Sequence, residues 1–160
     1  MKKLFIFIYG ILILTGNITP DAHADADINL SRGQTVYVSV YSHIYSGLKG
    51  RPFDLAATLS IRNTDLKNPI SIVSVNFYDT DGKLLKEYIK EPLQLKALAS
   101  TRYVIREAEI GGGSGANFIV QWKSEKQVNP PIIEAIMIGT RSGQGISFVS
   151  RGQVVKEHTE

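Results

Sequence analysis

Short runs that alternate between apolar and more polar residues, separated by Gly, Pro, Asn and Asp, constrain the fold of this chain more than any other feature. The clearest run covers residues 54–62, and a second covers residues 35–41. Their apolar positions are Val36, Val38, Val40, Leu55, Ala57, Leu59 and Ile61. A helix repeats every 3.6 residues, whereas a period of two places alternate side chains on opposite faces of a strand. We therefore expect an all-β domain.

Similar runs predict further strands over residues 70–78, 83–89, 101–106, 116–123, 132–140 and 146–150. The alternation changes phase near Ile72, which predicts a bulge or a strand buried on both faces. Seven or eight strands with turns at this spacing favour an immunoglobulin-like two-sheet sandwich. The sequence has no cysteine, so the sandwich has no disulfide. A β-barrel is the alternative. The predicted core contains Val38, Leu59, Ile61, Val75, Phe77, Phe118, Val120 and Trp122.

The first residues have the pattern of an export signal. Lys2 and Lys3 precede an apolar stretch over residues 4–14, which is shorter than the roughly 20 residues that a membrane-spanning helix needs. Small residues at Ala22 and Ala24 predict cleavage before Asp25. We therefore expect a periplasmic or extracellular protein. Its predicted parts are a signal peptide (1–24), a flexible arm (25–33), a β-sandwich domain (34–153) and a charged tail (154–160).

Composition argues against several functional classes. The formal net charge is only +3, and the Lys and Arg residues are interleaved with Asp rather than gathered into a patch, so we expect no nucleic-acid partner. No later apolar run reaches 18 residues, so we do not expect an integral membrane protein. The absence of cysteine rules out thiolate metal sites and a cysteine nucleophile.

No motif in the sequence indicates a metal ion or a cofactor. The run 79–83 begins like a calcium-binding loop, but the required Gly and Glu are replaced by Leu84 and Lys90, which favours a hairpin turn. The glycine-rich run 111–115 leads into a predicted strand and lacks the Lys-Ser/Thr ending of a phosphate-binding loop. We interpret it as a flexible connection.

A hydrolase remains an alternative in sequence terms. His43 could act with Ser42 or Ser46 and with Asp54, but no Gly-x-Ser-x-Gly motif presents a nucleophile. We therefore predict no catalytic residue, and a structural role for His43 is the simpler interpretation.

Two groups of residues are candidate binding surfaces. Tyr37, Tyr41, His43 and Tyr45 alternate with the valines of the first run, so they form either an exposed aromatic row or part of a covered core. The second group consists of Arg141 and Gln144 in a glycine-rich loop, with Arg151 beyond the last predicted strand. Arginines can grip a carboxylate or phosphate, so this group predicts an anionic ligand or partner. Its alternative is a solvated turn.

Residues 51–65 (RPFDLAATLSIRNTD) resemble the signature of an uncharacterised family of exported bacterial proteins, a domain of unknown function. The runs YDTDGK (78–83), GGSGANFIVQW (112–122) and IGTRSGQGISFVSRGQ (138–153) extend this resemblance over residues 34–153. It implies a bacterial, exported domain and transfers no activity or site.

Three functional hypotheses follow. The first is a non-enzymatic binding or accessory module of the bacterial cell envelope, whose partner is an envelope protein or an anionic ligand. The second is a small exported hydrolase. The third is a structural subunit that oligomerises through residues 132–138, where both strand faces are apolar. That run is Ile132, Ile133, Glu134, Ala135, Ile136, Met137 and Ile138.

Overall fold

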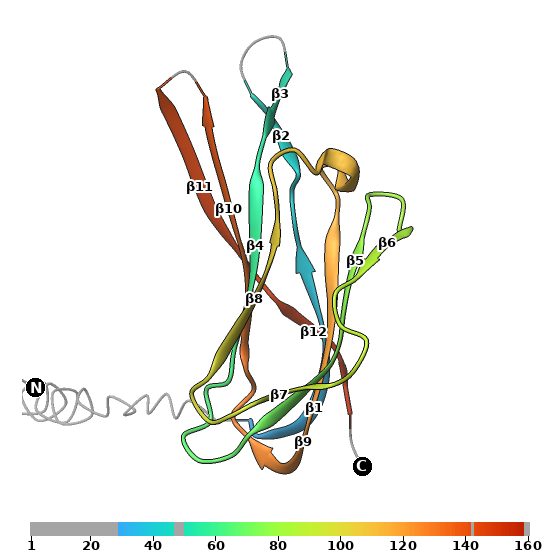
Figure 1. The fold of residues 1–160 in the computed structure, drawn as a ribbon, viewed down its shortest axis with the longest axis vertical. Coiled ribbons are helices and arrows are strands. Elements are labelled where there is room, and N and C mark those ends of the chain that lie inside the picture. Colours follow the sequence, from blue (N-terminus) through green and yellow to red (C-terminus); the bar gives the residue numbers. More distant parts are fainter. Residues whose placement is uncertain (1–28, 47–49, 142, 159–160) are drawn as a thin grey trace, which may run out of the picture.

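The computed structural model describes residues 29–46, 50–141 and 143–158 (Figure 1). The predicted signal peptide, its cleavage point after Ala24 and residues 25–28 of the predicted arm lie outside these ranges. Within them there is no helix with the length and apolar character needed to cross a membrane.

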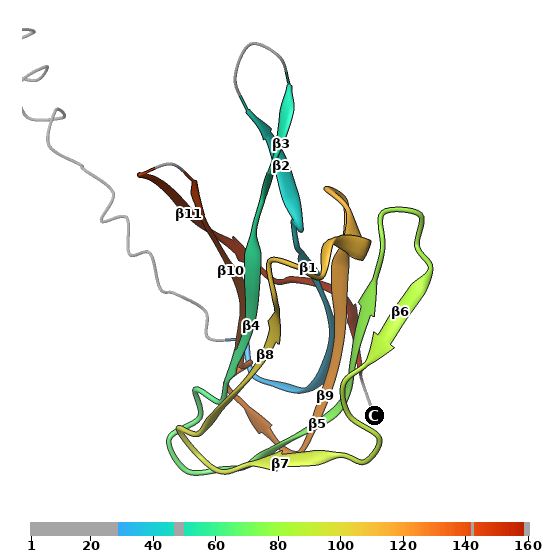
Figure 2. The ribbon, with the colours of Figure 1, turned by 45° about the horizontal axis from the view of Figure 1, so that its top comes forward.

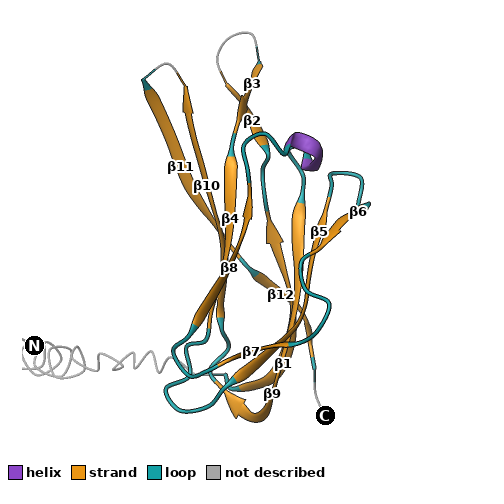
Figure 3. Cartoon of the chain, viewed as in Figure 1, coloured by secondary structure: helices purple, strands orange, loops and turns teal. Residues whose placement is uncertain are grey.

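Twelve β-strands and one short 3₁₀ helix, η1 (Ile110–Gly112), make up the described part of the chain (Figure 3). One sheet has six strands in the order β12 (Gln153–Glu157), β1 (Ser31–Ser39), β9 (Asn117–Val128), β5 (Ile70–Tyr78) and β6 (Leu84–Glu87), with β7 (Leu93–Leu95) also paired to β5. The second sheet has four strands, in the order β11 (Gln144–Arg151), β10 (Ile132–Arg141), β4 (Ala56–Arg62) and β8 (Ser100–Ile105). A separate hairpin pairs β2 (His43–Ser46) with β3 (Arg51–Asp54).

The two main sheets face each other as a sandwich and are not closed into a barrel (Figure 2). Every strand pair is antiparallel. The number of strands exceeds the predicted seven or eight because of four short additional strands. β2 follows β1 and β3 precedes β4, and these two pair as a separate hairpin. β7 pairs with β5, and β12 forms near the end of the chain and pairs with β1.

The core consists of the apolar side chains that point inward from the strands of both sheets. All eight residues predicted for it are buried, and Trp122 is the largest fully buried side chain. In β5 the register shifts between Ile72 and Ser74, which confirms the predicted bulge. The extra residue lets both Ile72 and Val75 face the interior, although they are separated by an odd number of positions.

The chain crosses from one sheet to the other between β11 and β12. Gly152 stands at the crossing, and its N–H donates to the Ile133 carbonyl oxygen at 2.8 Å. A Cβ at this position would lie 2.6 Å from both that oxygen and Val36 Cγ1, so only glycine fits the close approach. The crossing carries residues 153–157 into the six-stranded sheet beside β1. Residues 154–157 of the predicted charged tail lie in this strand, and β1 begins at Ser31, inside the predicted arm.

Buried polar side chains join the loops at one end of the sandwich. Asn63 donates from its amide to the carbonyl oxygens of Asn68, Leu95 and Lys96 at 2.9–3.3 Å. Asp65 accepts hydrogen bonds from the backbone N–H groups of Lys67, Asn68 and Asn129. These bonds favour the ionised carboxylate and lower the pKa of Asp65 below its ordinary value of 3.8, against the opposing effect of burial. This end of the molecule is therefore held by specific polar contacts.

The glycine-rich run 111–115 is tied down at the other end, which corrects its interpretation as a flexible connection. The Thr80 hydroxyl donates to the Gly112 carbonyl oxygen and accepts from the Gly115 N–H, both at 3.0 Å. Gly112 is buried, and Gly113 has a φ of 78°, which favours glycine. The nearby run 79–83 forms the predicted hairpin turn, with Gly82 at a φ of 78°.

Candidate functional site

The two predicted arginines lie at opposite ends of the β10–β11 hairpin. Arg141 pairs with Gln144 at its tip, whereas Arg151 pairs with Glu134 near its base. Seven positions of β10 separate Arg141 from Glu134, which corresponds to about 23 Å at the usual rise of a strand. The structure therefore does not bring Arg141 and Arg151 together around one ligand.

Arg141 has a structural partner. Its Nη1 atom donates to the Pro52 carbonyl oxygen at 3.0 Å, which connects the β10–β11 hairpin with the neighbouring β2–β3 hairpin. Figure 1 shows both hairpins extending beyond the sandwich at the same end. Gln144 is exposed beside it. This contact gives Arg141 a role in positioning the two hairpins.

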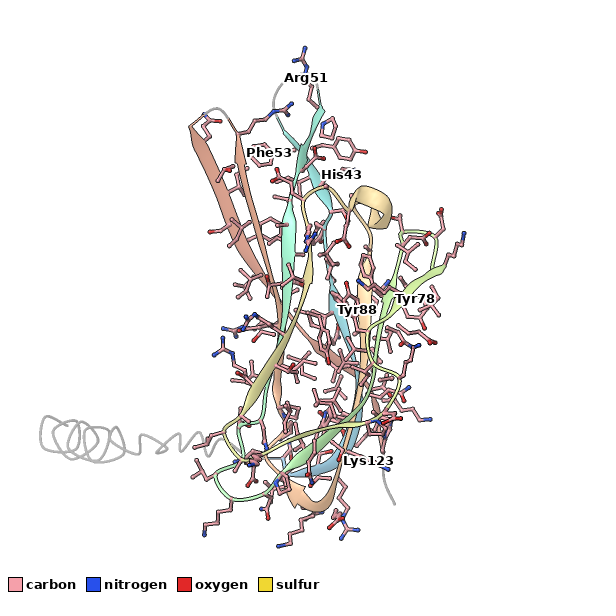
Figure 4. All side chains as sticks on the ribbon, viewed as in Figure 1. His43, Arg51, Phe53, Tyr78, Tyr88 and Lys123 are labelled. Atoms are coloured by element: carbon pink, nitrogen blue, oxygen red, sulfur yellow. The ribbon has the colours of Figure 1, made fainter. Side chains whose placement is uncertain are left out.

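The predicted aromatic row is divided among three places. Tyr37 lies on the outer face of the six-stranded sheet, between Ile119 and Gln153. Tyr41 packs against Phe148 with ring centroids 5.7 Å apart. His43, labelled in Figure 4, lies on the β2–β3 hairpin. It forms a separate edge-to-face pair with Tyr45, with ring centroids 5.2 Å apart. The row breaks up because β1 ends at Ser39 and the following residues leave the sheet.

Ser42, His43 and Asp54 do not form a hydrolytic triad, and the side chain of Ser46, the other predicted nucleophile, lies outside the described part of the structure. His43 Nε2 lies 3.3 Å from the Tyr45 hydroxyl, and Asp54 is its cross-strand neighbour. The Ser42 hydroxyl is buried without a hydrogen-bond partner among the described residues, so it does not contact the imidazole. The arrangement lacks the nucleophile–base hydrogen bond on which such catalysis depends.

The outer face of the four-stranded sheet carries a largely apolar row of side chains that come from distant parts of the sequence. Val149 pairs with Ile136, Ile136 with Thr58, and Thr58 with Val104, so these side chains cross all four strands. On the same face of β10, Ile138 lies next to Ile136, whereas Glu134 separates Ile136 from Ile132. The side chains of Val104, Ile132, Ile138 and Val149 are each between 46 % and 53 % exposed. Single exposed apolar residues are ordinary, but a contiguous group of them marks an interaction surface.

Three arginines lie on one side of this apolar row. Arg151 is paired with Glu134, Glu134 with Ser60, and Ser60 with Arg102, which forms a second row parallel to the first. Arg62 follows beside Ile132, and its Nε donates to the Ser60 hydroxyl at 3.1 Å. We call the surface formed by Val104, Ile132, Ile136, Ile138 and Val149 with Arg62, Arg102 and Arg151 the arginine-rimmed face.

A hollow of about 700 Å³ opens at one end of the arginine-rimmed face. Its walls include Arg62, Ile132, Glu134 and Arg151. The hollow therefore combines an exposed apolar side chain with two guanidinium groups. Such a site can receive an apolar side chain together with a carboxylate, because a guanidinium forms strong, directed hydrogen bonds to carboxylate oxygens.

Comparison with known proteins identifies the family. The sequence model of a family described as "Protein of unknown function (DUF3124)" matches residues 33–155. The chain belongs to this family. This confirms the resemblance carried by residues 51–65 and the three shorter runs. No curated protein matches the chain.

One solved structure is similar in shape. It is described as "Crystal Structure of Thermotoga maritima 1070", with a TM-score of 0.47 and 14 % sequence identity, and the match covers 81 % of this chain and 99 % of that chain. We infer neither fold nor function from a likeness of this degree.

Part of the arginine-rimmed face could have been found in the sequence. The run 132–138 was predicted to be apolar on both faces, and the structure places Ile133, Ala135 and Met137 inside and the even-numbered residues outside. Arg151 was also a candidate. The contributions of Arg62, Arg102 and Val104 could not be recognised from the local sequence, because they depend on the strand order, which places β4 beside β10 and β8 beside β4.

Proposed function

We propose that this protein is a non-enzymatic binding module exported to the bacterial cell envelope, and that it binds an acidic partner protein through the arginine-rimmed face. The observation that carries the proposal is the row crossing four strands, in which three of the four side chains are apolar and two of them, Val104 and Val149, are about half exposed. Keeping such a row in contact with water has a cost, and covering it by a partner recovers that free energy at roughly 25 cal/mol per Å² of apolar surface.

The charges on this face favour an acidic protein over a second copy of the same chain. Three arginines lie on the face, whereas Glu134 is its only carboxylate in the strand register. Two copies docked face to face would bring six guanidinium groups near two carboxylates, and unmatched like charges oppose association. A partner with acidic side chains around an apolar centre would match both the row and its rim.

Export is supported by the N-terminal sequence, in which Lys2 and Lys3 precede a short apolar stretch and the small residues Ala22 and Ala24. The absence of cysteine is compatible with an oxidising compartment, because the sandwich is stabilised by its buried core and needs no disulfide. We propose cleavage before Asp25 and a periplasmic or extracellular location.

Charge reversal on the face tests the proposed function. We expect the double variant Arg62→Glu/Arg102→Glu, produced with its own N-terminal segment in a bacterial host, to lose the partner that the wild type retains from envelope extract. Both side chains are exposed, so folding should be preserved. The matched control is Lys83→Glu/Lys90→Glu, which makes the same change in charge at exposed positions away from this face and should retain the partner.

The identity of the retained protein and its dependence on salt complete the test. We expect an acidic protein whose retention weakens as salt rises, because salt screens contacts at an exposed rim. Equal retention by the two double variants would contradict the proposal. Size-exclusion chromatography at several protein concentrations tests the alternative that the face binds a second copy of the chain. A dimer that forms as concentration rises and is lost in Arg62→Glu/Arg102→Glu would assign the face to self-association instead.

A further inference from the structure

The outer face of the six-stranded sheet contains a polar cleft that is distinct from the arginine-rimmed face. Its volume is about 890 Å³, and it lies where β12, β1 and β9 run side by side. Figure 4 shows Lys123 near the lower end of the sandwich, far from Arg51 on the β2–β3 hairpin at the upper end. We call it the basic cleft, and the residues that characterise it are Arg32, Thr35, Gln121, Lys123, Lys156 and His158.

Strand register places the polar side chains of the cleft on one face. Thr35 is paired with Gln121 on one side and with Lys156 on the other, and Gly33 is paired with Lys123. The register of β1 shifts on both sides of this group, between Ser31 and Gly33 against β9 and between Thr35 and Val36 against β12. Bulges of this kind bend a strand and redirect side chains, and they often occur beside binding sites.

His158 is fixed over the cleft by two contacts with β1. Its backbone N–H donates to the Gly33 carbonyl oxygen at 2.9 Å, and its Nε2 lies 2.9 Å from the Thr35 hydroxyl. A Cβ at Gly33 would meet the Trp122 carbonyl oxygen at 2.7 Å and would lie 3.4 Å from His158 Nδ1. Because Gly33 has no side chain, no Cβ occupies the space next to Nδ1 of the His158 imidazole.

The charge balance of the cleft favours an anion. Arg32, Lys123 and Lys156 contribute three cations, and the acidic residues of its lining are Glu125 and Glu157. The carboxylate of Glu157 already accepts hydrogen bonds from the Ser31 hydroxyl and from the Gln34 amide, so it is held against β1. The ammonium groups of lysine bind phosphate as point charges, and the Thr35 hydroxyl can add a directed hydrogen bond.

The remaining lining indicates what the anion is attached to. Gln121 offers both a donor and an acceptor, and Glu125 offers an acceptor, which are the groups that bind hydroxyls. The volume also exceeds the need of a single ion and falls in the range of small-molecule sites, from about 300 to 1,000 Å³. We propose that the basic cleft binds a phosphate group carried by a small hydroxyl-bearing unit, such as a glycerol phosphate, either free or as a lipid head group.

Titration of ¹⁵N-labelled protein with glycerol 1-phosphate tests this proposal. We expect the amide signals of Gly33, Thr35 and Gln121 to shift, and binding to be tighter than that of inorganic phosphate. In the double variant Lys123→Ala/Lys156→Ala, affinity should fall roughly tenfold or more, as expected for the loss of charge-assisted contacts. Both lysines are exposed, so the spectrum should otherwise report an intact fold. The control Lys83→Ala/Lys90→Ala removes two exposed lysines elsewhere and should bind like the wild type.

Vesicles distinguish the two sources of the phosphate. Co-sedimentation with phosphatidylglycerol vesicles, absent with phosphatidylcholine vesicles and lost in Lys123→Ala/Lys156→Ala, would assign the head group, whereas binding to soluble glycerol 1-phosphate alone would assign the free ligand. The proposal is overturned if the lysine variant binds like the control, or if inorganic phosphate binds as tightly as glycerol 1-phosphate. Neither result would affect the partner test, because the arginine-rimmed face lies on the other sheet.

Discussion

The two outer faces of the sandwich differ although the two sheets are built from the same alternating pattern. On the central strands of the six-stranded sheet, the outer rows are nearly all polar and uncharged, and their side chains are half buried. They are Thr35, Gln121 and Ser74, then Tyr37, Ile119 and Asn76, then Ser39, Asn117 and Tyr78. On the four-stranded sheet, one outer row consists of Val149, Ile136, Thr58 and Val104, and the next row carries Arg151 and Arg102. One face is compatible with water, and the other has apolar surface to bury.

The difference between the two outer faces shows that folding determines the residue type at inward strand positions but not at outward ones. The inward positions of both sheets are apolar because they must build one core, and any sequence with this fold meets that condition. The outward positions have no such constraint, and a polar choice such as that of the six-stranded sheet suffices for a stable, solvated face. The apolar residues on the outer face of the second sheet therefore need another reason, which the proposed binding role would supply.

The largest expected effect comes from two neighbouring residues of β10 that point in opposite directions. Met137 is fully buried, whereas Ile138 is 52 % exposed on the arginine-rimmed face. Met137→Ala should lower the free energy of unfolding by about 2–5 kcal/mol, because it removes core contacts and leaves a cavity. Ile138→Thr keeps a β-branched side chain and should change it by less than about 0.5 kcal/mol.

Chemical denaturation of the two variants measures this contrast. A large loss in both would show that Ile138 supports the fold and that its exposure does not mark a binding surface. Small losses in both would place the core elsewhere than between the two sheets.

A smaller effect is expected from Asp65, which lies in the polar junction at the end of both sheets. In the folded protein, the pKa of Asp65 is lowered most by the backbone hydrogen bond from Lys67, and also by those from Asn68 and Asn129, whereas burial raises it. A carboxyl group whose folded pKa lies below its unfolded value stabilises the fold above the unfolded value and loses that contribution as pH falls through the folded one. The stability of the wild type should therefore fall as pH is lowered below about 4.

The variant Asp65→Asn isolates this contribution. We expect it to be less stable than the wild type at neutral pH and the difference to shrink in acid, as followed by thermal unfolding from pH 7 to below 4. A difference that stays constant across this range would mean that the carboxylate charge is not involved. Neither face of the sandwich should be affected, so partner binding at neutral pH is the internal control.

The fold was largely predictable, since period-two alternation is a local property that identifies strands and their inward side. Leu59, Val120 and Trp122 were assigned to the core on this basis, and all are fully buried. The bulge in β5 could also be predicted from the sequence, because the alternation changes phase between Ile72 and Val75.

The surfaces were less predictable, because they depend on which strands become neighbours. Val104 and Val149 lie 45 positions apart in the sequence and meet in one row only through β4 and β10. The prediction of a single aromatic row was wrong for a related reason. Alternation predicts one face only while a strand remains in its sheet, and the chain leaves the six-stranded sheet between Tyr37 and Tyr41.

Site-specific photo-crosslinking in the producing cells tests the central claim most directly. A photoreactive residue would replace Ile138 on the arginine-rimmed face or, as the matched position, Ile119 on the outer face of the six-stranded sheet. The account predicts a crosslink from position 138 to an acidic protein, its loss when Arg62→Glu/Arg102→Glu is added, and no crosslink to that protein from position 119. Crosslinks to the same protein from both positions, or from position 119 alone, would contradict it.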